Sequence, residues 1–224
     1  MGIDIEKIIF RKDIETLKKE LSENPILANE GVLLADGNTL PAHPLHRVCD
    51  AVFAKKITDN DAVEMAKILL EYGANIDGDG VIDKKDSPLL AAASLHAEQT
   101  GIFYVDRGAN VHFTGNDGET ALHWAAYCGR DKLTKRLIEA GADINKRDTS
   151  YNSTPLGWAV HNLAQEDNFN TYHQLECIKQ LLKAGADVNM LGKDAVEYLH
   201  TIAGKDAELK ALLCNRFTLL EGAT

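Results

Sequence analysis

The 224-residue sequence carries 34 acidic and 24 basic side chains, which gives a formal net charge of −10. Because phosphate binding needs a basic face, this balance argues against a nucleic-acid partner and favours a basic protein partner. No apolar run approaches the roughly 18 residues of a membrane-spanning helix. We therefore expect a cytoplasmic, monomeric protein that contacts neither nucleic acid nor membrane.

The N-terminal segment does not resemble a targeting signal. Residues 1–15 carry acidic side chains early and lack a long apolar core, which disfavours a secretory signal peptide. Glu6 stands where the N-myristoylation pattern requires Ser or Thr. The cysteines form no C-x-x-C pair, which disfavours a zinc or redox motif and fits reduced thiols in the cytoplasm. They are Cys49, Cys128, Cys177 and Cys214.

The first predicted elements are two short helices within residues 3–28. Their apolar side chains recur at helical spacing, and the segment 22–25, which ends in proline, terminates the second helix. We interpret residues 1–37 as an N-terminal cap, because this segment lacks the repeated phrases that follow it. The apolar positions are Ile5, Ile8 and Ile9, then Ile14, Leu17 and Leu21.

From residue 38 onwards, two phrases recur along the chain. An anchor of the type Ser/Thr-Pro-Leu starts at His43, Ser87, Thr120 and Thr154. A second phrase, Gly-Ala followed by Asn or Asp, starts at Gly73, Gly108, Gly141 and Gly185. Their spacing gives a unit of about 33 residues, with insertions of about ten residues at 51–61 and 163–173. Such a period indicates a stacked array of similar units.

Each unit is predicted to form two antiparallel helices and a turn. The anchor starts the first helix, because its hydroxyl caps free N–H groups and proline suits the first turn. Leu133, Leu137 and Ile138 give the second helix of one unit an apolar face. The glycine of the second phrase ends that helix, where a left-handed backbone conformation is needed.

These phrases resemble the ankyrin repeat, whose signature is T-P-L-H-x-A followed by G-A-D-x-N, and the match is clearest over residues 115–147. The resemblance implies an all-α ankyrin-repeat solenoid of about six helix-turn-helix units in one domain, 1–224. Four units occupy 38–192, and 193–224 form a C-terminal cap and tail. His46 and His123 take the place of the signature histidine, which ties neighbouring turns together in this family. The departures from the signature are His43 for Thr, and Leu90 and Gly157 for His.

The resemblance also implies a partner-binding surface, the concave face made by the first helices and the turn tips. Trp124 and Trp158 take the same place in adjacent units, where they either pack as framework or form an exposed aromatic patch of the kind enriched at binding hot spots. Tyr127 is the strongest candidate for contact, because the fold constrains its position less. The full predicted set is Leu95, Phe113, Asn116, Asp117, Glu119, Trp124, Tyr127, Tyr151, Trp158, His161 and Asn162.

Three further features leave alternatives open. The two insertions are either lengthened surface loops without a role or a second contact surface. Asn145 and Asn189 occupy the place that asparaginyl hydroxylases modify in animal ankyrin repeats, or they only stabilise the turn. Residues 75–86 fit part of a calcium-binding loop, although the same stretch is explained as a long turn between units. The matching positions are Asn75, Asp77, Asp79, Gly80, Ile82, Asp83 and Asp86.

No catalytic constellation accompanies the repeats, since the sequence contains no G-x-S-x-G, P-loop or H-E-x-x-H pattern. We therefore predict a non-catalytic protein-binding module, an adaptor, scaffold or inhibitor, that needs neither a cofactor nor a metal. The alternatives are a calcium- or small-ligand-responsive module and a secreted bacterial effector that acts in a host cell.

Overall fold

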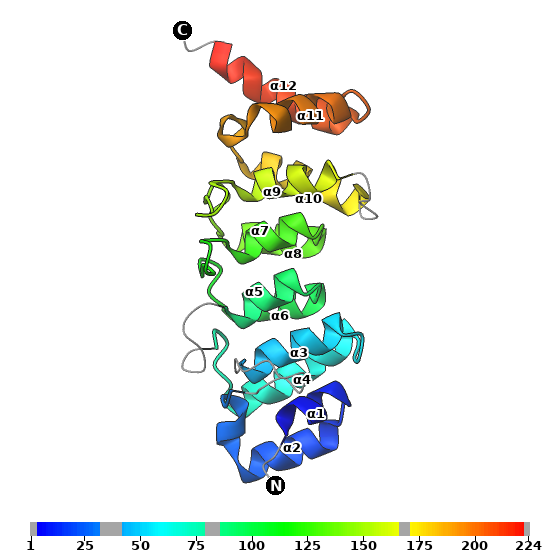
Figure 1. The fold of residues 1–224 in the computed structure, drawn as a ribbon, viewed down its shortest axis with the longest axis vertical. Helices are drawn as coiled ribbons and strands as arrows, with labels where there is room; N and C mark the ends of the chain where they lie inside the picture. The colour runs from blue at the N-terminus through cyan, green and yellow to red at the C-terminus, as the bar shows by residue number, and fades with distance from the viewer. Residues whose placement is uncertain (1–3, 32–41, 79–85, 166–170, 222–224) are drawn as a thin grey trace. The chain divides into compact units, whose positions relative to one another are not determined.

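The computed structural model describes residues 4–31, 42–78, 86–165 and 171–221 (Figure 1). Within these ranges the chain forms twelve α-helices and two short 3-10 helices, and the helices follow one another as six antiparallel pairs. The expected all-α repeat architecture is confirmed. The chain divides into two compact units, which are larger than the repeats of about 33 residues. We call them unit 1 (Met1–Asn116) and unit 2 (Asp117–Thr224), and each contains three helix pairs.

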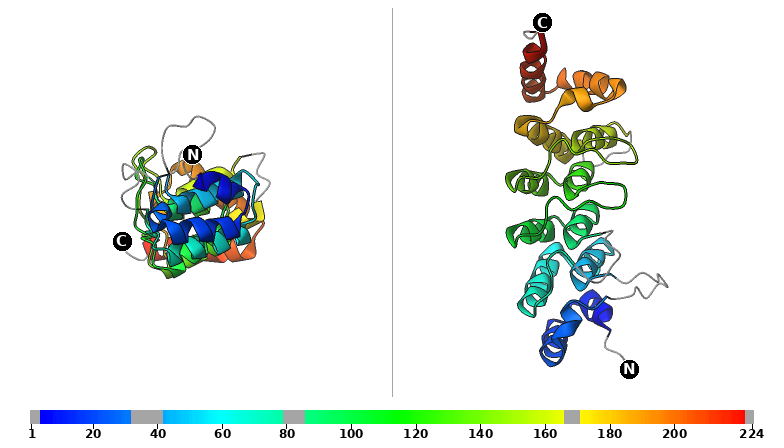
Figure 2. Two further views of the ribbon diagram at one scale, coloured as in Figure 1. Left: turned by 90° about the horizontal axis from the view of Figure 1, so that it is seen from below. Right: turned by 90° about the vertical axis from the view of Figure 1, so that its left-hand side faces the viewer.

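Unit 1 consists of two layers of helices (Figure 2). One layer contains α1, α3 and α5, which contact one another in that order, and the other contains α2, α4 and α6. The two helices expected within residues 3–28 are present. The bounds are α1 (Ile5–Phe10), α2 (Ile14–Glu23), η1 (Pro25–Ala28), α3 (Pro44–Phe53), α4 (Asp59–Glu71), α5 (Pro88–Ser94) and α6 (Glu98–Asp106).

Unit 2 repeats this two-layer arrangement. Helix α9 lies between α7 and α11 in one layer, and α10 lies between α8 and α12 in the other. Within the described ranges, no helix of either unit combines the length and the apolar character that crossing a bilayer requires. The bounds are α7 (Ala121–Tyr127), α8 (Asp131–Glu139), α9 (Pro155–Leu163), α10 (Thr171–Ala184), η2 (Val188–Met190), α11 (Lys193–Ala203) and α12 (Ala207–Glu221).

The anchor phrase starts helices as predicted. Ser87 Oγ accepts a hydrogen bond from the backbone N–H of Leu90 at 3.1 Å, which satisfies a donor that the first turn leaves free. His43 replaces the usual hydroxyl residue and keeps the cap, because its Nδ1 accepts from the N–H of Leu45 at 3.1 Å. Burial lowers the pKa of His43 to about 4, so its imidazole stays neutral and Nδ1 remains an acceptor.

The second phrase links successive turns to one another. Gly141 has a φ of +85°, which a glycine adopts without strain. Asp143 Oδ1 then accepts from the N–H of Asn145 at 3.0 Å, and Asn145 Oδ1 accepts from the N–H of Asp187, in the next copy, at 2.9 Å. Within each compact unit, therefore, one copy of the phrase bonds to the next. Equivalent bonds in unit 1 join Asn29 to Asn75 and Asp77 to Asn110.

The first insertion mainly lengthens helices and does not form the long loop considered from the sequence. Helices α3 and α4 have 10 and 13 residues, against 7 and 9 in α5 and α6. Helices α9 and α10 have 9 and 14 residues, against 7 and 9 in α7 and α8. Ala51 and Ile57 of the first insertion are buried, so this insertion contributes to the core. Residues 166–170 of the second insertion lie outside the described ranges.

Candidate partner-binding site

Five of the predicted partner-binding residues line one pocket in unit 2. We call this pocket, of about 450 Å³, the aromatic pocket. Its walls come from neighbouring helices α7 and α9 and from the turn that leads into α9 (Figure 1). The lining residues are Trp124, Tyr127, Tyr151, Ser153, Gly157, Trp158 and His161.

Three rings of the pocket pack edge to face. Trp124 and Trp158 have ring centroids 5.1 Å apart and planes at 86°, and Tyr127 lies 5.9 Å from Trp124 and 5.8 Å from Trp158 at 85° and 77°. Such perpendicular contacts are attractive and hold the rings in one arrangement. All three side chains are half-buried. Each tryptophan therefore packs on its neighbours as framework and also forms a wall of the pocket.

The buried carboxylate of Asp148 positions this wall. Only 2% of Asp148 is exposed, and its Oδ2 accepts from the indole Nε1 of Trp158 and from the N–H of Ser153, each at 3.0 Å. Its Oδ1 accepts from the N–H of Tyr151 at 2.6 Å. Burial raises the pKa of Asp148, but these hydrogen bonds outweigh burial and hold the pKa below its ordinary value. The carboxylate is therefore ionised and connects Trp158 to the adjacent turn.

A second hollow, of about 510 Å³, adjoins the aromatic pocket and shares four of its lining residues. Gly157 lines both hollows, and it stands where the repeat signature has histidine. A Cβ atom at this position would lie 2.3 Å from Ser153 Oγ, so the wild-type turn leaves no room for a side chain there. Arg147 also lines the second hollow, and it donates to the carbonyl oxygens of Asn152 and Met190.

Three predicted residues have structural contacts and do not line the pocket. The side-chain amide of Asn162 donates to the carbonyl oxygen of Tyr127 at 2.6 Å, so this residue joins α9 to α7. Glu119 is buried and its Oε2 accepts from the N–H of Asp117 at 2.9 Å. Asp117 Oδ1 in turn accepts from the hydroxyl of Ser150 at 2.8 Å. These contacts shape the turns beside the pocket.

The remaining predicted residues lie in unit 1, so the structure does not assign them to the aromatic pocket. Leu95, at the end of α5, and Phe113 are half-buried, whereas Asn116 is exposed.

Asp148, which supports the pocket through its hydrogen bonds, was not predicted from the sequence. An aspartate in a polar turn carries no sequence signal of burial, so only its hydrogen bonds identify it.

The stretch that resembles a calcium-binding loop is partly engaged in other contacts. Asn75 Oδ1 accepts from the N–H of Asp77 at 2.9 Å, and Asp77 Oδ1 accepts from the N–H of Asn110. Asp86 Oδ2 lies 2.8 Å from Nε2 of His46. The other matching residues, Asp79, Gly80, Ile82 and Asp83, lie outside the described ranges. Within those ranges, no group of three or more His, Cys, Asp or Glu side chains is arranged to hold a metal ion.

Asn145 and Asn189 both have the turn-stabilising contacts considered from the sequence. Asn145 carries the bond between successive phrases described above. The side-chain amide of Asn189 donates to Asp187 Oδ1 at 2.8 Å, within the turn that precedes α11.

Comparison with known proteins matches residues 89–191 to the family model "Ankyrin repeats (3 copies)", and this stretch contains the whole aromatic pocket. Ankyrin repeat and SOCS box protein 6 of mouse is 34% identical over 136 residues, which cover 60% of this chain and 30% of the relative. Palmitoyltransferase ZDHHC17 of Danio rerio is 32% identical over 111 residues, which cover 47% of this chain and 16% of the relative. The chain thus spans less than a third of the length of these relatives.

Proposed function

The chain belongs to the ankyrin repeat family, and we propose that it is a non-catalytic adaptor, scaffold or inhibitor that binds a partner protein through the aromatic pocket. Ankyrin repeats are generally protein–protein interaction modules. The palmitoyltransferases among the relatives are aligned over only a small part of their length. Their catalytic activity therefore gives no reason to propose an enzyme here.

The observation that carries this proposal is the set of half-exposed aromatic side chains in one pocket. Trp124, Tyr127 and Trp158 are held edge to face, so they lose little conformational freedom when a partner covers them. Tryptophan and tyrosine dominate the energy of protein interfaces because each buries a large area. Tyr151, 79% exposed at the rim, extends the surface that a partner can cover.

The cysteines support the proposed cytoplasmic location. None of the four forms a disulfide bond, and Cys49 and Cys177 are buried. Disulfide-free chains of this kind are typical of reducing compartments.

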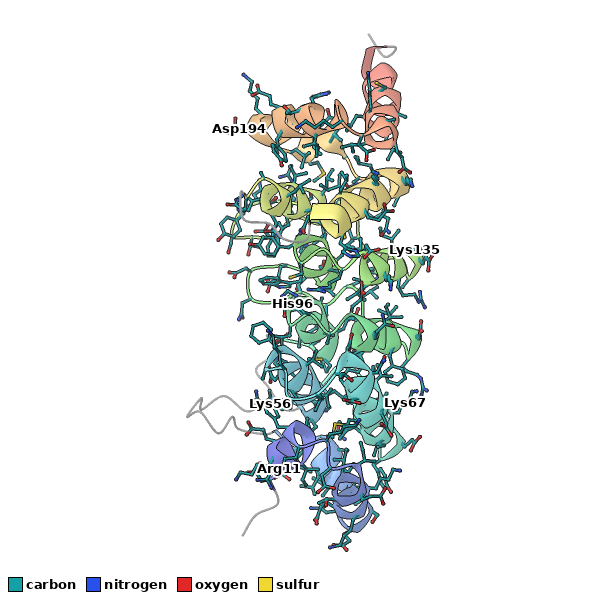
Figure 3. The ribbon with its side chains drawn as sticks, turned by 90° about the vertical axis from the view of Figure 1, so that its right-hand side faces the viewer. Arg11, Lys56, Lys67, His96, Lys135 and Asp194 are labelled. Carbon is teal, nitrogen blue, oxygen red and sulfur yellow. The ribbon has the colours of Figure 1, made fainter. Side chains whose placement is uncertain are left out.

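The proposal is tested by affinity capture with two matched double variants. Tyr151→Ala/His161→Ala alters the rim of the pocket, where both side chains are exposed. Lys135→Ala/Glu139→Ala changes two exposed residues of α8; Lys135 lies on the outer edge of unit 2 (Figure 3). We expect a partner to be recovered by the wild type and the α8 variant and to be lost by the rim variant, with unchanged circular dichroism. Equal recovery by all three proteins would place the contact elsewhere.

A further inference from the structure

We propose that the aromatic pocket receives a cationic side chain, arginine or lysine, from a basic segment of the partner protein. This inference rests on the proposed function and adds the chemistry of the group that is bound. It follows from the arrangement of the rings, from the charge behind them and from the absence of lysine and arginine among the seven residues that line the pocket.

The three rings line the pocket in different orientations. An aromatic ring attracts a cation that lies over its face within about 6 Å of the centroid, and tryptophan attracts it most strongly. Trp124, Tyr127 and Trp158 have nearly perpendicular planes and centroids 5.1 to 5.9 Å apart. A charge seated among them therefore lies within reach of more than one ring. This geometry suits a cation better than a single flat apolar group, which can stack on only one face.

The carboxylate behind the wall strengthens the attraction. Asp148 accepts the indole N–H of Trp158 at 3.0 Å, and a hydrogen bond to an ionised acceptor polarises its donor. Electron density is thereby shifted toward the indole ring, whose face becomes more negative. Asp148 is only 2% exposed, so little water contacts its carboxylate directly. An incoming cation is attracted through the ring and does not need to form a direct ion pair.

One positive charge lies near the aromatic pocket but not in its lining. Arg147 lines the neighbouring hollow, and its guanidinium group is engaged by the carbonyl oxygens of Asn152 and Met190. The net charge of −10 attracts basic segments at long range. The chain already contains the same chemistry in unit 1, where Arg107 lies 4.8 Å and Lys67 5.8 Å from the ring centroid of Phe103.

Tryptophan fluorescence gives a site-specific test, because both tryptophans of the chain line the pocket. The probes are a peptide of alternating arginine and glycine and the same peptide with citrulline, which is uncharged and has nearly the same shape as arginine. We expect the arginine peptide to change the emission saturably at physiological salt. The citrulline peptide should bind at least tenfold more weakly.

Two variants link the response to the pocket. Trp124→Leu removes one ring and keeps Trp158 as the reporter. This variant should bind the arginine peptide at least fivefold more weakly. Asp148→Asn removes the charge behind Trp158 and should also lower the affinity for the arginine peptide. Thermal unfolding checks that the turn stays folded in this variant. Lys135→Ala on α8 should leave the affinity unchanged.

Two results would overturn the inference. Equal affinity for the arginine and citrulline peptides would show that the pocket selects shape and not charge. The absence of any response to millimolar arginine peptide would exclude a cationic occupant. In either case the proposed function stands as long as the rim variant loses a partner that the α8 variant retains, so the two failures are distinguishable.

Discussion

The signature histidine occurs at His46 and His123, and its surroundings give it opposite charge states. His123 is buried, its Nδ1 accepts from the N–H of Thr120 at 3.1 Å, and its Nε2 lies 3.3 Å from the carbonyl oxygen of Ser153. Burial lowers its pKa to about 4, so it is neutral. The equivalent His46 lies between the carboxylates of Asp50 and Asp86, at 3.2 and 2.8 Å. Although burial lowers its pKa, the two carboxylates outweigh burial and raise it to about 9.

The charge of His46 predicts a loss of stability at alkaline pH. Its pKa rises from 6.5 to about 9 on folding, so its contribution is complete below pH 6.5 and is lost as the pH rises toward 9. The shift corresponds to about 3 kcal/mol in the free energy of unfolding. Urea denaturation between pH 6.5 and 9 should show this loss in the wild type and not in His46→Gln, which cannot be protonated. Parallel stability curves for the two proteins would contradict the prediction.

At the scale of the element, helix α9 is adapted to the pocket at its first turn. Thr154 Oγ1 accepts from the N–H of Gly157 at 3.2 Å and caps the helix. Glycine is a poor helix residue, because it loses more backbone freedom on folding than alanine. Here its missing side chain leaves room for Ser153 Oγ and lets the two hollows meet.

A double-mutant cycle separates the effect of helix propensity at position 157 from the steric effect of Ser153 Oγ. In the Ser153→Ala background the obstructing hydroxyl is gone, so Gly157→Ala should stabilise the protein by about 0.5 kcal/mol through helix propensity. In the wild-type background the new Cβ atom would lie 2.3 Å from Ser153 Oγ, so this hydroxyl must move. The gain in stability should therefore be smaller or reversed. Urea denaturation of the four proteins measures the coupling free energy. A coupling of zero would mean that Ser153 does not restrict position 157.

At the scale of the whole molecule, the last helix pair covers one end of unit 2. Helix α11 packs on α9 and α12 packs on α10, and Leu199, Leu209 and Leu213 are buried there. Lys179 of α10 supports this contact, since its Nζ lies 2.8 Å from Asp206 Oδ2 and 3.2 Å from Glu208 Oε2. We propose that residues 193–224 act as a C-terminal cap, as the sequence predicts.

Removing residues 193–224 should therefore destabilise unit 2. Each fully buried leucine contributes about 2 kcal/mol, so the loss of three should lower the free energy of unfolding by several kcal/mol. It should also expose the apolar faces of α9 and α10 and promote aggregation. Urea denaturation and light scattering measure both effects, with a chain ending at residue 221 as the control. An unchanged midpoint and a soluble truncated chain would show that the pair is not a cap.

The sequence predicted those features whose bonds are local or repeated. Ser87 caps α5 through a contact three residues away, and Gly141 ends its turn through its own backbone conformation, so short phrases are sufficient to specify them. The periodic spacing then indicated the stacked helix pairs. Four of the pocket residues, Trp124, Tyr127, Trp158 and His161, could be selected for the same reason, because equivalent positions in adjacent repeats lie side by side.

The tertiary structure alone decided how these side chains are used. Trp158 finds the carboxylate of Asp148 ten residues away, and Asn162 turns inward to the carbonyl oxygen of Tyr127 at a separation of 35 residues. Similarly, His46 is charged because it contacts the carboxylate of Asp86, the residue before the next anchor. His123 is neutral, and it faces the backbone carbonyl of Ser153, the residue before the anchor that follows it. Repetition specifies where a side chain lies, but its partners and its charge depend on the packing of individual, non-repeated neighbours.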